Sequence, residues 1–149
     1  MFNWIRRKIM DKTKETKRIS YSKYLWKRVN HLDFTIENFY CEEEVCPICI
    51  KALAQYKHYN VVLNEDYLLG PDVSIWNFTI NDKPYVWIWD VITGENTIRA
   101  KFIENPDNTE NKTLEKIMQD LCDVLNMLVE KGEIESTDDT SSDWQPKHY

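Results

Sequence analysis

Residues 73–102 decide the fold, and they read VSIWNFTINDKPYVWIWDVITGENTIRAKF. Apolar and polar side chains alternate from Val73 to Ile80, which is the period of a strand with one buried face. The stretch from Tyr85 to Val91 is almost continuously apolar and rich in aromatic and β-branched residues, which indicates a strand covered on both faces. Residues 98–102 alternate again. Short turn sequences separate the three segments, so we predict a three-stranded antiparallel β-meander.

The segment after Pro106 carries the strongest helical pattern in the chain. Its apolar residues recur at the spacing that one face of an α-helix requires, and they are Leu114, Ile117, Met118, Leu121, Leu125, Leu128 and Val129. Thr113 can cap the start of this helix, and Gly132 can end it. We therefore predict a long amphipathic helix over residues 113–131 that packs against the sheet.

Two further helices are predicted before the meander. Residues 20–31 have apolar side chains at helical spacing, and the residues expected to be buried are Tyr21, Leu25 and Val29. Pro47 suits the first position of a second helix, which runs to about Lys57. The predicted fold class is α+β, with the three-stranded meander packed against a long C-terminal amphipathic helix and preceded by N-terminal helices.

A chain of 149 residues has room for one packed domain with attached arms. We predict a basic helical arm over residues 1–33, an α+β domain over 34–131 and an acidic flexible tail over 132–149. No segment approaches the roughly 18–20 consecutive apolar residues of a membrane span, and the first residues lack the apolar run of a signal peptide. We therefore expect a cytoplasmic protein, in the host cytoplasm if it is viral, with reduced cysteines.

Charge is distributed unevenly along the chain, whose formal net charge is −6. Residues 1–30 hold ten basic and two acidic residues, a local charge of +8, which leaves −14 for the remainder. Such a segment is attracted to phosphate, to lipid headgroups, to an acidic partner or to the protein's own acidic half. The residues predicted to bind nucleic acid or an acidic partner are Arg6, Arg7, Lys8, Lys12, Lys14, Lys17, Arg18, Lys23, Lys27 and Arg28.

Three cysteines form the only cluster with metal-ligand spacing. Cys41, Cys46 and Cys49 follow the pattern C-x4-C-x2-C, and His58 comes nine residues later. Zinc takes four sulfur or nitrogen ligands in a tetrahedron, so these four residues are the predicted ligands of a zinc ion. The alternative is that the cysteines are small buried hydrophobic residues in the first turn of a helix.

The chain lacks the sequence motifs of common catalytic sites. It has no P-loop, no GxGxxG, no nucleophile elbow and no HExxH pattern, and only three glycines occur in it. We therefore expect a protein that is not an enzyme.

Two families resemble parts of the predicted order of elements. The succession of a helix, three strands and a helix over residues 47–131 resembles the double-stranded RNA-binding fold, a resemblance that implies RNA binding through a lysine-rich start of the last helix. Residues 108–120 depart from that pattern, because they carry only Lys112 and Lys116 against three acidic residues. The meander also resembles the opening of an RNase H-like transposase domain, whose first-strand acid would fall near Ser74.

Three functions remain as hypotheses. The leading one is a small interaction or regulatory protein, of the kind that viruses and mobile elements use, that binds and modulates a host protein. The second is a nucleic-acid-binding regulator that uses the basic arm and a zinc-stabilised turn. The third is a peripheral membrane-associated accessory protein, and the residues predicted to contact the membrane are Phe2, Trp4, Ile5 and Ile9. These four residues can also dock on the domain itself.

Overall fold

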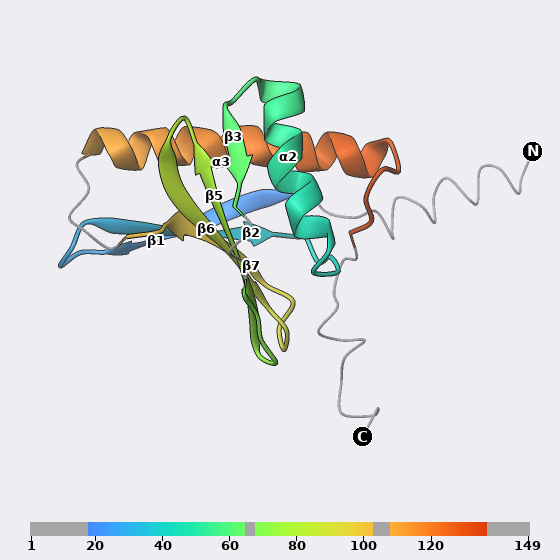
Figure 1. Ribbon diagram of the computed structural model, residues 1–149, viewed down its shortest axis with the longest axis horizontal. Helices are drawn as coiled ribbons and strands as arrows, with labels where there is room; N and C mark the ends of the chain where they lie inside the picture. The colour runs from blue at the N-terminus through green and yellow to red at the C-terminus, as the bar shows by residue number, and fades with distance from the viewer. Residues whose placement is uncertain (1–17, 65–67, 103–107, 137–149) are drawn as a thin grey trace, which may run out of the picture.

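The computed structural model describes residues 18–64, 68–102 and 108–136. Its elements, in chain order, are β1 (Ser20–Trp26), β2 (His31–Glu37), α2 (Val45–Lys57), β3 (Val61–Leu63), β4 (Leu68–Leu69), β5 (Val73–Ile80), β6 (Lys83–Asp90), β7 (Asn96–Ala100) and α3 (Asn108–Glu130). The seven strands form one antiparallel sheet in the order β1-β2-β7-β6-β5-β3, and β4 also pairs with β5. Figure 1 shows α3 running across the strands, with α2 crossing it.

The sequence-based prediction of the sheet was wrong. The three predicted strands correspond to β5, β6 and β7, but these strands belong to a seven-stranded sheet and do not form a sheet of their own. The pairing of β2 with β7 adds the β1–β2 hairpin on one side, and β3 and β4 pair with β5 on the other. The added strands also remove the basis of both family resemblances, which rested on a three-stranded meander.

The predicted helix over residues 20–31 was also wrong. This segment forms β1, the turn after it and the first residue of β2, and all seven β1 residues pair with β2, from Ser20 opposite Glu37 to Trp26 opposite His31. The residues between Ser20 and Trp26 are largely polar or aromatic and gain pairing partners in the sheet, which outweighs their helical spacing.

The two helices extend beyond their predicted starts. Pro47 is the third residue of α2, which begins at Val45, and the helix ends at Lys57, where His58 adopts a left-handed conformation with φ of 61°. The helix α3 begins at Asn108, five residues before the predicted cap. Thr113 therefore lies inside the helix, where its hydroxyl donates to the carbonyl of Thr109 over 2.9 Å.

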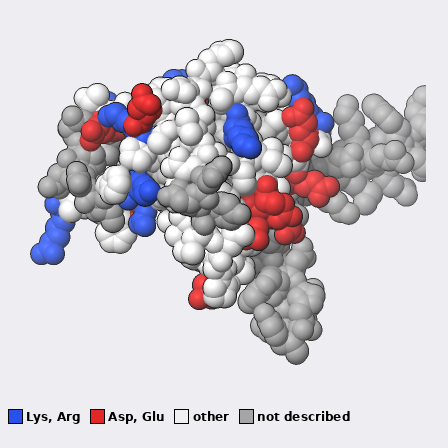
Figure 2. Space-filling model, viewed as in Figure 1, with Lys and Arg blue, Asp and Glu red and all other residues white. Residues whose placement is uncertain are grey.

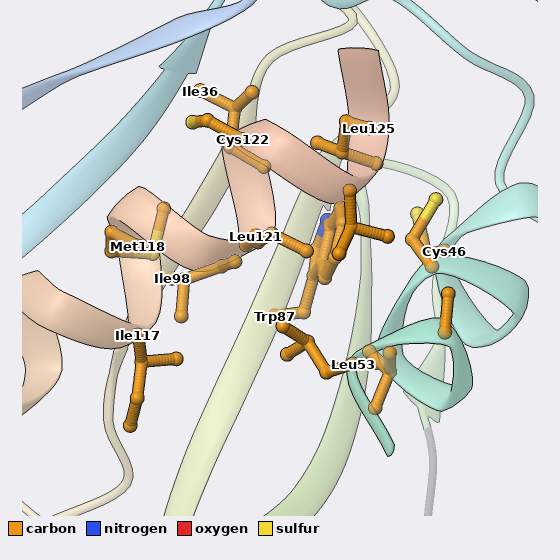
Figure 3. Close-up of a cluster of buried hydrophobic side chains, with 14 of the residues drawn as sticks. Ile36, Cys46, Leu53, Trp87, Ile98, Ile117, Met118, Leu121, Cys122 and Leu125 are labelled. Carbon is orange, nitrogen blue, oxygen red and sulfur yellow. The ribbon is translucent and has the colours of Figure 1, made fainter. Parts of the chain in front are cut away.

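One hydrophobic core lies between the sheet and the two helices. Its strand residues come from alternating positions that face the same side of the sheet, as in Trp76, Phe78 and Ile80 of β5. Trp87 of β6 is fully buried, and Figure 3 shows its side chain pointing toward Leu121 and Leu125 of α3. The apolar stripe of α3 and the buried residues of α2 close this core from one side.

The opposite face of the sheet has no helix over it in the part of the chain that the structure describes. Residues that oppose each other in antiparallel strands share a face, so the register places Asp33, Arg99, Val86 and Asn77 in one row across β2, β7, β6 and β5 on this open face. Neither described helix has the length and apolarity that crossing a bilayer requires.

Two leucines test this division between core and surface. Leu125 is fully buried in α3, whereas Leu68 in β4 is 57% exposed. We expect Leu125→Ala to lower the free energy of unfolding by about 3 kcal/mol, because truncation removes buried methyl groups and leaves a cavity. Leu68→Ala, the matched control, should cost less than about 1 kcal/mol. Urea denaturation followed by tryptophan fluorescence measures both values, and equal losses would contradict the described core.

Candidate functional site

The β1–β2 hairpin carries two cationic residues beyond the end of the sheet. The chain turns through residues 27–30, and the amide of Val29 donates to the carbonyl of Trp26 over 3.2 Å. Asn30 closes the turn with φ of 49°, a left-handed conformation that asparagine tolerates better than most residues do. Lys27 and Arg28 are exposed in this turn, and neither makes an ion pair with a described residue.

A pocket of about 890 Å³ opens beside this turn. Its size lies within the roughly 300–1,000 Å³ that is typical of ligand pockets. Residues of β1, the turn and β2 supply most of its wall, and β7 adds one residue from a distant part of the chain. The aromatic and basic side chains in this wall are Tyr24, Trp26, Lys27, Arg28, His31 and Arg99.

Two exposed aromatic rings stand at the wall of the pocket. Tyr24 is 61% exposed and Trp26 is 50% exposed, although both are large and largely apolar. Their ring centroids lie 4.9 Å apart with an edge-to-face angle of 69°. The indole Nε1 of Trp26 donates to Oδ2 of Asp33 over 2.9 Å, which fixes the orientation of its ring. The pocket therefore presents positioned aromatic surface to solvent.

Buried polar atoms lie on β2 and β7, the strands next to the one that carries the aromatic rings. His31 is 1% exposed, and its Nε2 lies 3.0 Å from Oδ1 of Asp33 without the alignment of a hydrogen bond. Arg99 opposes Asp33 across the β2–β7 pair. Both ring nitrogens of His31, Oδ1 of Asp33 and Nε of Arg99 are buried and have no hydrogen-bond partner among the described residues.

Charged side chains of both signs lie at the hairpin end, and acidic ones gather at one other place. The hairpin end carries Lys27, Arg28 and Arg99, and Figure 2 shows Lys and Arg side chains at that end. Figure 2 also shows Asp and Glu side chains gathered beside the N-terminal end of α2, where residues 42–44 are three consecutive glutamates. The pocket therefore lies beside Lys27 and Arg28 and away from the three glutamates.

The structure divides the predicted basic residues into three groups. Lys27 and Arg28 line the pocket. Arg18 lies 3.9 Å from Asp123, and Lys23 donates to Glu115 over 3.0 Å, so these two side chains face α3. The hydrogen bond from Lys23 holds the pKa of Glu115 below its ordinary value. The other basic residues, Arg6, Arg7, Lys8, Lys12, Lys14 and Lys17, lie outside the described residues, as do Phe2, Trp4, Ile5 and Ile9.

The predicted zinc ligands are only partly brought together. Cys46 and Cys49 lie in the first turns of α2, and the thiol of Cys46 donates to Oδ1 of Asn96 over 3.6 Å. The same amide donates through Nδ2 to the sulfur of Cys41 over 3.9 Å. His58 follows the last residue of α2, about 18 Å along the helix from Cys46 at the usual rise per residue.

The environment of α2 disfavours the thiolate forms of Cys46 and Cys49. A hydrogen bond with Cys41 and burial raise the pKa of Cys46, and burial raises the pKa of Cys49. Within residues 18–64, 68–102 and 108–136, no group of three or more His, Cys, Asp and Glu side chains has an arrangement that could hold a metal ion. Zinc at Cys41, Cys46, Cys49 and His58 therefore stays a prediction from the sequence.

Comparisons with protein-family models, curated proteins and solved structures find no match to this chain. The assignment of the pocket as the candidate site therefore rests on its geometry.

Sequence reasoning missed the residues that make the pocket distinctive. The helical reading of residues 20–31 placed Leu25 in a buried face and gave no role to Tyr24 and Trp26. A strand reading of the same segment places Tyr24 and Trp26 on one face and Leu25 on the other, although Leu25 also lines the pocket. Arg99 could not be found in this way, because its place in the pocket depends on the pairing of β7 with β2.

Substitution of Asn96 tests whether the region around Cys41 and Cys46 is a packed part of the core. Its buried Oδ1 accepts from the indole of Trp87 over 2.8 Å and from the thiol of Cys46. We expect Asn96→Ala to lower the free energy of unfolding by about 3 kcal/mol, because both donors lose their partner in the interior. Urea denaturation measures the loss, and Asn60→Ala, at an exposed position, is the control. A loss below about 1 kcal/mol would show that the Asn96 amide does not organise this region.

Proposed function

We propose that this protein binds single-stranded nucleic acid at the pocket beside the β1–β2 hairpin. The observation that carries the proposal is the exposed edge-to-face pair of Tyr24 and Trp26 set beside Lys27, Arg28 and Arg99. A base stacked on an aromatic side chain gains about 1–3 kcal/mol, and lysine and arginine bind phosphates with release of counterions. A single strand carries bases and phosphates in alternation. The aromatic rings of the pocket wall can contact its bases while the cations of the same wall contact its phosphates.

A single strand fits this surface better than a duplex does. Its bases are free to leave their neighbours and lie on the ring faces of Tyr24 and Trp26, whereas the bases of a duplex are paired and stacked. This proposal develops the second hypothesis from the sequence, that of a nucleic-acid-binding regulator. The binding site is now the pocket beside the hairpin and not the basic N-terminal arm.

Removal of one ring tests the stacking surface. We expect Trp26→Ala to weaken binding of a fluorescein-labelled oligothymidylate, about twelve nucleotides long, by about 5- to 150-fold, the equivalent of one lost stacking contact. Fluorescence anisotropy at fixed salt measures the dissociation constant. Ile92→Ala is the control, because Ile92 is 54% exposed in the turn between β6 and β7. Equal affinities of the two variants would contradict stacking on Trp26.

Removal of the turn cations tests the phosphate contacts. Each phosphate contact to a single strand contributes about 0.7 to the slope of log K against log salt, so the double variant Lys27→Ala, Arg28→Ala should reduce that slope by about 1.4. The matched control is Lys51→Ala with Lys131→Ala, which removes the same charge from α2 and from the residue after α3. A wild-type protein that binds no single-stranded DNA or RNA at low salt would refute the proposed function and would leave the protein-partner hypothesis in its place.

A further inference from the structure

We infer that a second base of the same strand stacks on Phe102, in a smaller pocket next to the one beside the hairpin. This inference rests on the proposed binding of a single strand. The smaller pocket, which we call the Phe102 pocket, has a volume of about 360 Å³. That volume also lies within the roughly 300–1,000 Å³ of ligand pockets. Phe102 stands two residues after Ala100, the last residue of β7.

The two pockets are neighbours. His31 lines both of them and is itself only 1% exposed, so it belongs to the wall that they share. The strand order is β1-β2-β7, and two inter-strand spacings, about 10 Å, separate β1 from β7. A strand that places one base on Trp26 of β1 therefore brings its next bases close to Phe102.

Phe102 offers the same kind of surface as the rings of the hairpin. The residue is 58% exposed, so its ring is open to a flat partner. The wall around it is mainly apolar, with Leu32, Pro84, Tyr85, Ala100 and Leu114. Such a wall favours the face of a base over a phosphate, because a phosphate would lose its hydration there without an equivalent partner.

Cationic side chains lie beside this apolar wall. Nζ of Lys101 lies 5.9 Å from the centroid of the Phe102 ring, over one of its faces. A base on the opposite face keeps this contact and brings its adjoining phosphates near a positive charge. Glu110, the acidic residue of the wall, lies 3.6 Å from Nζ of Lys83, which offsets its repulsion of the strand.

Three labelled probes test the inference with the full chain. One is the oligothymidylate of about twelve nucleotides, and the other two keep its backbone but have abasic sites in place of all thymines except one, or except three consecutive central ones. One base fills one of the two pockets, whereas three consecutive bases fill both. We expect the wild type to bind the three-base probe at least about tenfold more tightly than the one-base probe.

Removal of the Phe102 ring should abolish most of this gain. Phe102→Ala should keep at most about threefold, because three bases still offer more ways than one to occupy the pocket beside the hairpin. Leu69→Ala is the control, because Leu69 is 53% exposed in β4 and should leave the gain unchanged.

The outcomes separate the inference from the proposed function. Binding of the oligothymidylate without a gain from one base to three would overturn the inference and leave the proposed function standing. A gain that survives in Phe102→Ala would also overturn it, and so would an equal loss of affinity for both abasic probes. No binding of the oligothymidylate would refute the proposed function and this inference together. The wild-type comparison needs no variant, so it decides even if Phe102→Ala does not fold.

Discussion

The pairing of β2 with β7 is the constraint on which the rest of the structure depends. It joins the N-terminal hairpin to the strands that follow α2, and it opposes Asp33 to Arg99 and Phe34 to Ile98. Because neighbouring residues of a strand face opposite sides, the same pairing places Phe34 and Ile98 in the core and Asp33 and Arg99 on the open face. A slip of one residue would reverse every one of these positions, so core packing fixes the register that also builds the pocket.

The two faces of the β1–β2 hairpin differ in their contacts. One face packs against α3, and the other exposes aromatic and polar side chains to solvent. The inward side of β1 is tied to α3, since the hydroxyl of Tyr21 donates to Glu115 over 2.9 Å and the backbone of Ile19 exchanges hydrogen bonds with Asn126. These contacts hold an edge strand whose outward side is otherwise exposed. Tyr24 and Trp26 are therefore presented by a fixed backbone, which lowers the entropy lost when a ligand binds.

Sequence patterns correctly predicted the secondary structure of segments with strong periodicity. They failed for segments whose secondary structure depends on pairing with a distant strand. The alternation around Trp76 and the apolar stripe around Leu121 locate β5 and α3, because each pattern reports burial against one neighbour. The segment around Tyr24 has weak helical spacing and equally weak alternation, and its partner β2 lies across a turn with no glycine. The pocket could not be predicted for the same reason, since no local pattern brings Arg99 and Trp26 to the same pocket.

Net charge is a poor guide to what this protein binds. The basic turn at Lys27 and Arg28 and the acidic residues 42–44 lie near opposite ends of the hairpin strands, and seven residues of strand span about 23 Å. The Debye length at physiological ionic strength is only about 8 Å, so the acidic end is screened from a ligand at the pocket. A phosphate near the turn therefore experiences Lys27, Arg28 and Arg99 far more than the total charge of −6. The proposed binding of an anionic strand therefore depends on where the cations lie, and the β1–β2 turn holds two of them beyond the end of the sheet.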